Sequence, residues 1–111
     1  MEGMSRIMPK VARGRSRDKV KTYHGCTSIT TTRDASNNVF VNKIGVHRHH
    51  DKNTTHTIPC GPSCCSHSRP IQTASPNVFA NKKGVARVGD PYSGCGKVLT
   101  GSPDVYANGG A

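Results

Sequence analysis

The sequence predicts an all-β fold, and a repeated phrase is the main reason. The stretch ASNNVFVNKIGVHRHHD, residues 35–51, returns as ASPNVFANKKGVARVGD at residues 74–90, with 11 of the 17 positions identical. A third copy, GSPDVYAN, begins near the end of the chain, in residues 101–111. Glycine and proline recur throughout, and no ten-residue window has the apolar spacing of a helix. Repetition this dense in 111 residues should govern the fold.

Each copy is predicted to form a short β-hairpin. NVFVN and NVFAN are β-prone runs, and VHRHHD and VARVGD supply the return strands. NKIG, NKKG and the terminal NGG are turn sequences, since Asn and Gly tolerate positive φ. One hairpin alone is marginal, so we expect three copies around one axis in a single domain, residues 1–111. The side chains expected to be buried together are Val39, Val41, Val78, Ala80, Val105 and Ala107. The alternative is a plain β-sandwich with a duplicated hairpin.

The composition indicates that the hydrophobic core is thin. Apolar residues make up 32% of the chain and aromatic residues 5%, with no Trp. Such a chain needs a metal or disulfides to hold it together, and it has five Cys and six His. No apolar run at the N-terminus has the length of a signal peptide, so we expect folding in a cytoplasm where thiols stay reduced. The odd Cys count also favours metal binding over a complete disulfide set.

The net charge of +10 favours anionic partners, such as nucleic acid or a phosphate-rich membrane surface. The strongest cluster is KVARGRSRDKVK, within a basic N-terminal segment at residues 1–22. For most of these charges, we expect a solvated arm with no specific partner.

Three candidate metal ligands precede the three repeats. His24 lies five residues before Ile29, His67 four residues before Ile71, and Cys95 three residues before Val98. A three-fold arrangement would bring these side chains together on the axis, as most of a tetrahedral zinc site. The fourth ligand is expected from the loop between the first two copies: His56, with Cys60 as the substitute. Four protein ligands leave no open position, so the zinc would be structural.

The remaining Cys and His residues have plainer interpretations. Cys60, Cys64 and Cys65 fit a second metal site, a disulfide or thiols without a role. We expect His47, His49 and His50 to be exposed or hydrogen-bonded on a return strand.

The repeats resemble the PAAR-repeat proteins, which form the pointed tip of contractile injection machines. The resemblance covers about residues 11–111 and rests on ASPNVFANKKGVARVGD followed by CGKVLTGSPDV; VARGRSRD at residues 11–18 is similar to a degenerate leading copy. The literal Pro-Ala-Ala-Arg is replaced by GVAR and GVHR, and His50 replaces the Gly of the "GD" phrase. The resemblance implies a cone with three His and one Cys around one zinc near its apex: His24, His56, His67 and Cys95.

The resemblance also implies a function. The base of the cone would cap a trimeric β-helical spike, one tip per trimer, and the apex would transiently meet the outer membrane of a target cell. A chain capping a three-fold partner must present the same edge three times. The expected location is a virion, at the tip of the tail baseplate spike, or an equivalent particle such as a type VI secretion system, assembled in the bacterial cytoplasm. We expect a structural protein and not an enzyme, because no acid–base pair, activated nucleophile or HExxH motif is found.

The leading alternative is a zinc-dependent nucleic-acid-binding module. It should have paired C-x-x-C or C-x-x-H units and aromatic stacking residues beside the basic cluster, and neither is found. We therefore expect no specific nucleic-acid partner. A secreted disulfide-rich peptide is a third option, disfavoured by the Cys count.

Overall fold

The computed structural model describes residues 9–107, and this part of the chain is all-β, without a helix. It therefore has no helix long and apolar enough to span a membrane. The strands are β1 (Lys19–Thr22), β2 (Ile29–Thr31), β3 (Phe40–Val41), β4 (Ile44–Gly45), β5 (His56–Cys60), β6 (Ser63–His67), β7 (Phe79–Ala80), β8 (Lys83–Gly84) and β9 (Gly96–Val98).

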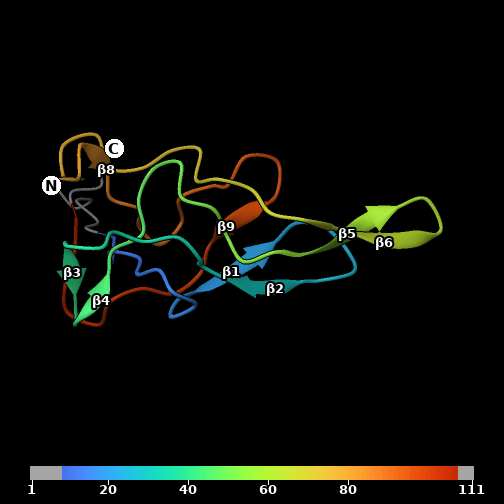
Figure 1. Ribbon diagram of the computed structural model, residues 1–111, viewed down its shortest axis with the longest axis horizontal. Coiled ribbons are helices and arrows are strands. Elements are labelled where there is room, and N and C mark those ends of the chain that lie inside the picture. The colour runs from blue at the N-terminus through green and yellow to red at the C-terminus, as the bar shows by residue number, and fades with distance from the viewer. Residues whose placement is uncertain (1–8, 108–111) are drawn as a thin grey trace, which may run out of the picture.

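The molecule tapers from a broad end to a narrow one (Figure 1). Hairpins β3–β4 and β7–β8 belong to the broad end, which we call the base. The three-stranded antiparallel sheet β2–β1–β9 occupies the middle, and the hairpin β5–β6 projects as the narrow apex. The expectation of a small all-β structure with a pointed end is confirmed.

The two long repeats form the expected hairpins, with tight two-residue turns. The turn residues have positive φ: 55° and 67° at Asn42 and Lys43, and 54° and 67° at Asn81 and Lys82. This is the turn type whose twist suits a two-residue hairpin. Gly45 and Gly84 were expected in the turns, but they belong to the return strands β4 and β8. A Cβ on Gly84 would lie 2.3 Å from the carbonyl oxygen of Ser75, so only Gly fits.

The third hairpin is completed by the beginning of the chain. Tyr106, the counterpart of Phe40 and Phe79, pairs with Lys10, and the Ala107 amide donates to the Pro9 carbonyl at 3.0 Å. Residues 10–13 thus supply the return strand of the third repeat, in keeping with the similarity of VARGRSRD to VARVGD. The expected turn at NGG lies outside the described residues. Residues 9–22 of the basic segment are therefore part of the fold and not a solvated arm.

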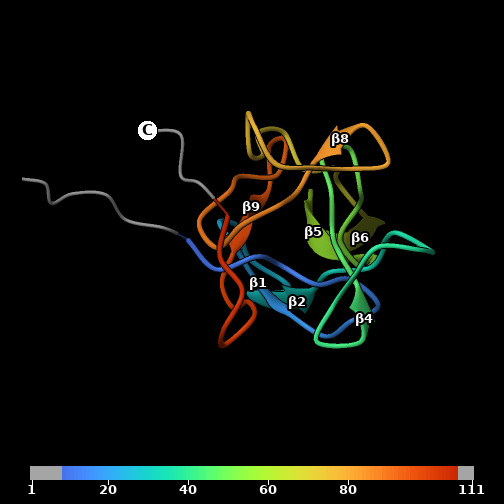
Figure 2. The same cartoon turned by 90° about the vertical axis from the view of Figure 1, so that its left-hand side faces the viewer.

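A closed ring of three backbone hydrogen bonds joins the three copies. The amide of Ala12 donates to the carbonyl of Ala86, that of Ala86 to His47, and that of His47 to Ala12, at 2.8 to 3.0 Å. All three residues are fully buried. Figure 2, which looks onto the base, shows the segments carrying β4 and β8 and the red C-terminal segment at three separate corners around this centre.

The Arg and Asp of the repeated phrase form a buried ion pair in each copy. The pairs are Arg13–Asp18, Arg48–Asp51 and Arg87–Asp90, with closest N–O distances of 3.0, 2.8 and 2.9 Å. Each Asp also accepts the backbone N–H of its Arg. Arg13 donates further to the turn residue Asn42, and Arg48 to Asn81. The motif thus ties each return strand to its own loop, and Arg13 and Arg48 also tie theirs to the turn of a neighbouring copy.

The core divides into two clusters, one behind the base and one in the middle. The base cluster consists of Val11, Val46, Ala80, Val85 and Ala107; the middle cluster consists of Ala12, Val20, Ile71, Ala86, Tyr92, Cys95 and Val98. Ala80 and Ala107 are buried as expected, and Val41 is half-buried. The prediction was wrong for three valines, which are exposed by about the same fraction: Val39, Val78 and Val105, at 37%, 38% and 37%. The centre of the fold is filled by the ring residues of the return strands, and not by these valines, which face outward from the base.

His47 is the one histidine in the ring, and it is fully buried. Its Nδ1–H donates to the Asp34 carbonyl at 2.6 Å, and its Nε2 accepts the Tyr92 hydroxyl at 2.8 Å. The sequence predicted that the His47 side chain is either exposed or hydrogen-bonded, and it is hydrogen-bonded. Burial lowers the pKa of His47, so the folded protein holds the imidazole neutral.

This lowered pKa predicts a loss of stability in acid. At a pH above about 6.5, the pKa of His47 in the unfolded chain, the contribution of neutral His47 to stability is fully present. As the pH falls toward the lower pKa of His47 in the folded protein, this contribution is lost, because the unfolded chain binds the proton more readily. Ala occupies this position in the other two copies, so His47→Ala is the natural comparison. Chemical denaturation of chelator-treated protein across this pH range should show a shallower acid loss for the variant. Parallel curves would contradict the prediction.

Candidate metal centre

The four predicted ligands meet at the junction of the apex hairpin with the middle sheet. His56 begins β5 and His67 ends β6, and the two residues are directly opposite in the register. His24 follows β1, and Cys95 immediately precedes β9. Their ligand atoms all lie within 4.8 Å of one another. The structure therefore brings together every residue that the sequence singled out, with His56 and not Cys60 as the fourth.

The hydrogen bonds of two rings direct their lone pairs into the centre. His56 Nδ1 is 2.8 Å from the Thr54 carbonyl oxygen, and His24 Nδ1 is 3.0 Å from the Gly25 carbonyl oxygen. A carbonyl only accepts, so each Nδ1 carries the proton and each Nε2 presents a bare lone pair. These two Nε2 atoms are 3.3 Å apart, with no proton to share between them. Such a cluster of acceptors fits a cation, and the carbonyls provide the outer hydrogen bonds typical of metal-bound His.

The separations suit a tetrahedral ion of zinc size. His56 Nε2 and His67 Nε2 are 2.8 Å apart, and Cys95 Sγ lies 3.4 and 3.3 Å from the Nε2 atoms of His24 and His56. Tetrahedral zinc with ordinary bond lengths would place two nitrogens about 3.3 Å apart and nitrogen and sulfur about 3.6 Å apart. The group is thus compatible with a metal ion after shifts of a few tenths of an ångström.

The surroundings of Cys95 favour metal binding over a free thiolate. Burial raises the pKa of this thiol, so without a cation it stays protonated. The Asn53 amide lies 3.7 Å from Sγ and counteracts the effect of burial as a hydrogen-bond donor. A bound divalent ion would deprotonate the thiol outright. Asn53 was not identified from sequence, since a single Asn between repeats carries no spacing signal.

The apex beyond the histidines is held by disulfides, contrary to the expectation of reduced thiols. Cys26 is paired with Cys64 and Cys60 with Cys65, which leaves Cys95 as the free cysteine of the described chain. Cys64 and Cys65 are consecutive on β6, so their side chains point to opposite faces of the hairpin. The four sulfurs therefore divide between two faces, and this arrangement favours two disulfides over a second metal site. The bond between Cys60 and Cys65 also removes the possibility that Cys60 replaces His56.

Two further histidines are outside the centre, as expected. His49 and His50 stack with ring centroids 3.8 Å apart, and His49 Nε2 is bonded to the Gln72 carbonyl at 2.9 Å.

Comparison with known families agrees with the repeats. Residues 61–111 match the family model of the PAAR motif. The chain carries a PAAR motif. The match spans the second and third repeats together with His67 and Cys95. PAAR motifs are associated with spike-tip proteins of contractile injection systems, and the family is structural, not catalytic. No curated protein matches this PAAR chain.

Proposed function

We propose that this PAAR chain is the tip of a contractile injection machine and that its base caps the blunt end of a trimeric β-helical spike. One observation carries the proposal: the base presents the same exposed aliphatic–aromatic pair in each of the three repeats. The pairs are Val39–Phe40, Val78–Phe79 and Val105–Tyr106. The aromatic members are 55%, 59% and 47% exposed.

These pairs have the properties of an interface. Exposed apolar side chains gathered at one end of a small protein mark a binding surface, and aromatic residues are enriched in interface cores. In addition, β3 and β7 lie at the edges of their two-stranded sheets. A partner that ends in strands would cover both the apolar side chains and the open strand edges. Three equivalent contacts from a single chain suit a partner with three-fold symmetry.

The opposite end suits penetration. The apex hairpin has no buried residue between His56 and the end of β6, so apolar packing does not stabilise it. We propose that a structural zinc, held by His24, His56, His67 and Cys95, fixes its root, while the two disulfides fix its end. Force along the axis would then load covalent and coordinate bonds. The chain would act mechanically, in a phage tail or an equivalent particle, on the envelope of a target cell.

Docking is tested with a matched pair of exposed aromatics. Phe79→Asp in the base should weaken co-purification with the trimeric spike protein encoded nearby by at least about 10-fold, because central aromatic contacts dominate interfaces. Tyr23→Asp is the control, since Tyr23 is 67% exposed and lies away from the base. Both variants should keep the wild-type melting temperature. Equal binding by all three proteins, or no complex with the wild type, would reject the docking surface.

A further inference from the structure

The positive charge of the described chain is not balanced by its acidic residues. Three of its carboxylates are buried in the ion pairs of the repeats, and Asp34 is paired with Arg33. Asp104 accepts hydrogen bonds from Asn42 and Ser102 at the base. Every lysine of residues 9–107 therefore lacks a carboxylate within ion-pair distance. The surface cations face solvent, available to an external anion.

Several of these cations share one face of the middle sheet. In β2–β1–β9, Val20, Thr22 and Val98 point into the protein, so the alternate residues point outward. The register puts Lys21 between Ile29 and Lys97, while Lys19 lies beside Thr31. Leu99 extends the third strand and donates its amide to the Lys19 carbonyl at 2.8 Å. We call Lys19, Lys21, Tyr23, Ile29, Lys97 and Leu99 the lysine face.

The lysine face contains a pair of like charges, which lowers the stability of the folded protein. Lys21 and Lys97 are directly opposite on neighbouring antiparallel strands. Like charges in this position repel each other, and no acidic side chain lies between them in the described structure. An external anion would remove this repulsion.

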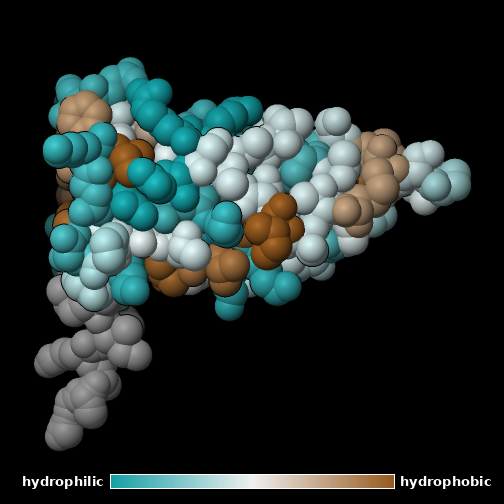
Figure 3. Space-filling view, turned by 90° about the horizontal axis from the view of Figure 1, so that it is seen from below, coloured by the Kyte–Doolittle hydropathy of each residue, from teal (hydrophilic) through white to brown (hydrophobic). Residues whose placement is uncertain are grey.

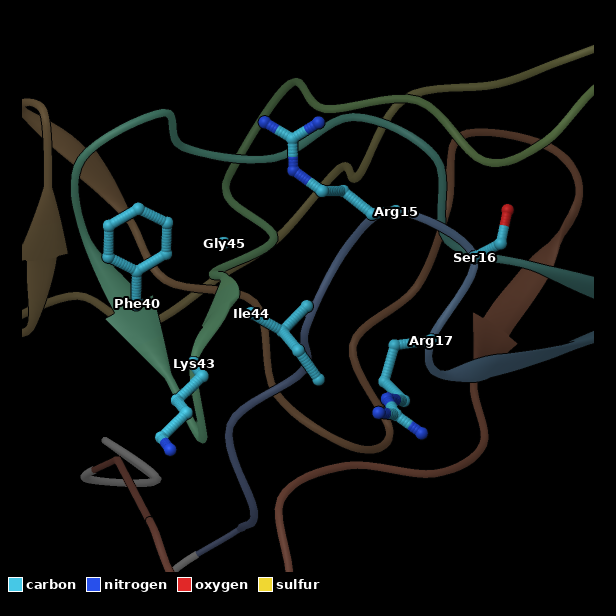
Figure 4. Close-up of a pocket in the computed structure, with 7 residues that line it drawn as sticks. All are labelled: Arg15, Ser16, Arg17, Phe40, Lys43, Ile44 and Gly45. Carbon is cyan, nitrogen blue, oxygen red and sulfur yellow. The ribbon is translucent and has the colours of Figure 1, made fainter.

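The positive surface continues from the lysine face toward the base. An open hollow there is lined by Arg15, Ser16, Arg17, Phe40, Lys43, Ile44 and Gly45. In Figure 4, Ile44 lies between Phe40 and Arg17, with the cationic chains around them. Arg15 is bonded to Asn37 at 3.0 Å, whereas Arg17 and Lys43 have no carboxylate partner among the described residues. Since Phe40 belongs to the base, this hollow borders the docking surface and is kept apart from the lysine face.

We propose that the lysine face forms a binding surface for a phosphate-bearing lipid membrane. Charge complementarity points to an anionic surface, and the exposed apolar residues point to lipid. Ile29 and Leu99 are 43% and 38% exposed beside lysines whose long stems can lie along them. Tyr23 adds an amphipathic ring, which suits the headgroup region. Figure 3, a view onto the side of the molecule, shows brown patches next to teal ones along the flank. Nucleic-acid binding would instead call for several aromatic stacking platforms, whereas Ile29 and Leu99 are aliphatic.

The test is sedimentation of the full chain with vesicles of phosphatidylcholine, with and without phosphatidylglycerol. The wild type should bind only the anionic vesicles, and less at high salt. The triple variant Lys19→Gln, Lys21→Gln, Lys97→Gln should bind them on the order of 100-fold more weakly, since each surface lysine contributes about a factor of five. The control, Lys52→Gln, Lys82→Gln, Lys83→Gln, removes the same charge elsewhere and should bind nearly as the wild type does. Removal of the Lys21–Lys97 repulsion should leave the melting temperature of the first variant unchanged or higher.

Three results would overturn the proposal: no binding by the wild type, equal loss in the two triple variants, or tighter binding of duplex or single-stranded DNA than of vesicles. Spike docking is a separate property, because the triple variant leaves the base aromatics intact. Loss of vesicle binding with normal docking would support the lipid surface, whereas failure of docking alone would leave it standing.

Discussion

A His67→Ala protein is expected to contain no zinc and to melt at least about 10 °C below the wild type. His67 is half-buried and belongs to neither core cluster, so its truncation acts through the metal and not through packing. Structural zinc contributes its binding free energy to folding, and each kcal/mol moves the melting temperature of a domain of this size by about 4–8 °C. Elemental analysis and calorimetry measure the two effects.

His49→Ala is the matched control for the metal centre. It also removes an imidazole, bonded to a carbonyl, but one outside the four-residue group. It should keep one zinc per chain and most of the stability. A chelator should lower the melting temperature of the wild type and of His49→Ala, while His67→Ala should not respond. A wild-type protein that is purified without metal and is indifferent to chelator would refute the zinc site.

The second large effect is expected from the disulfide between Cys26 and Cys64. It closes a loop with a sequence separation of 38, for which chain entropy gives about 4 kcal/mol of stabilisation, whereas Cys60–Cys65, with a separation of 5, gives about 2 kcal/mol. The double variant Cys26→Ser, Cys64→Ser should therefore melt about 15–30 °C lower than the wild type. The Cys60→Ser, Cys65→Ser protein should lose roughly half as much.

Reductant separates this effect from any effect of the serines. It should lower the wild-type melting temperature to that of a protein lacking all four cysteines of the apex, with the metal kept in excess. Mass spectrometry of the alkylated, non-reduced protein should find one reactive thiol after denaturation. Four additional free thiols, or melting unaffected by reductant, would contradict the two disulfides.

Most of the architecture followed from the repeats, and the metal centre followed from their spacing. The positions of His24, His67 and Cys95 before three copies of one phrase predicted that the three side chains converge, and they do. That success has a physical reason: equal segments with equal contacts place their preceding residues equivalently. Their role as ligands, and the identity of the ion, remain predictions.

The errors arose where tertiary context decides. The alternation of side chains along a strand predicted which residues share a face. It did not predict which of the two faces is turned toward the centre of the protein, so Val39 and its counterparts were wrongly placed inside. Gly45 and Gly84 were assigned to the turns because the sequence of one strand does not show that another segment's carbonyl oxygen lies close to it. A disulfide was one of three alternatives for Cys60, Cys64 and Cys65, but the bond to Cys26 was missed, because a Cys count indicates the redox state only weakly. The position of Cys26, two residues after His24, could have shown that it lies near the apex.

The pairing of Lys10 with Tyr106 has a consequence for biosynthesis. The two halves of this repeat are far apart in the sequence, so the hairpin cannot close until Tyr106 has left the ribosome. Until then, Val11 lacks the Val105 carbonyl to which its amide donates. Contacts this distant in sequence are entropically slow to form, so we expect this repeat to close after the hairpins of the other two.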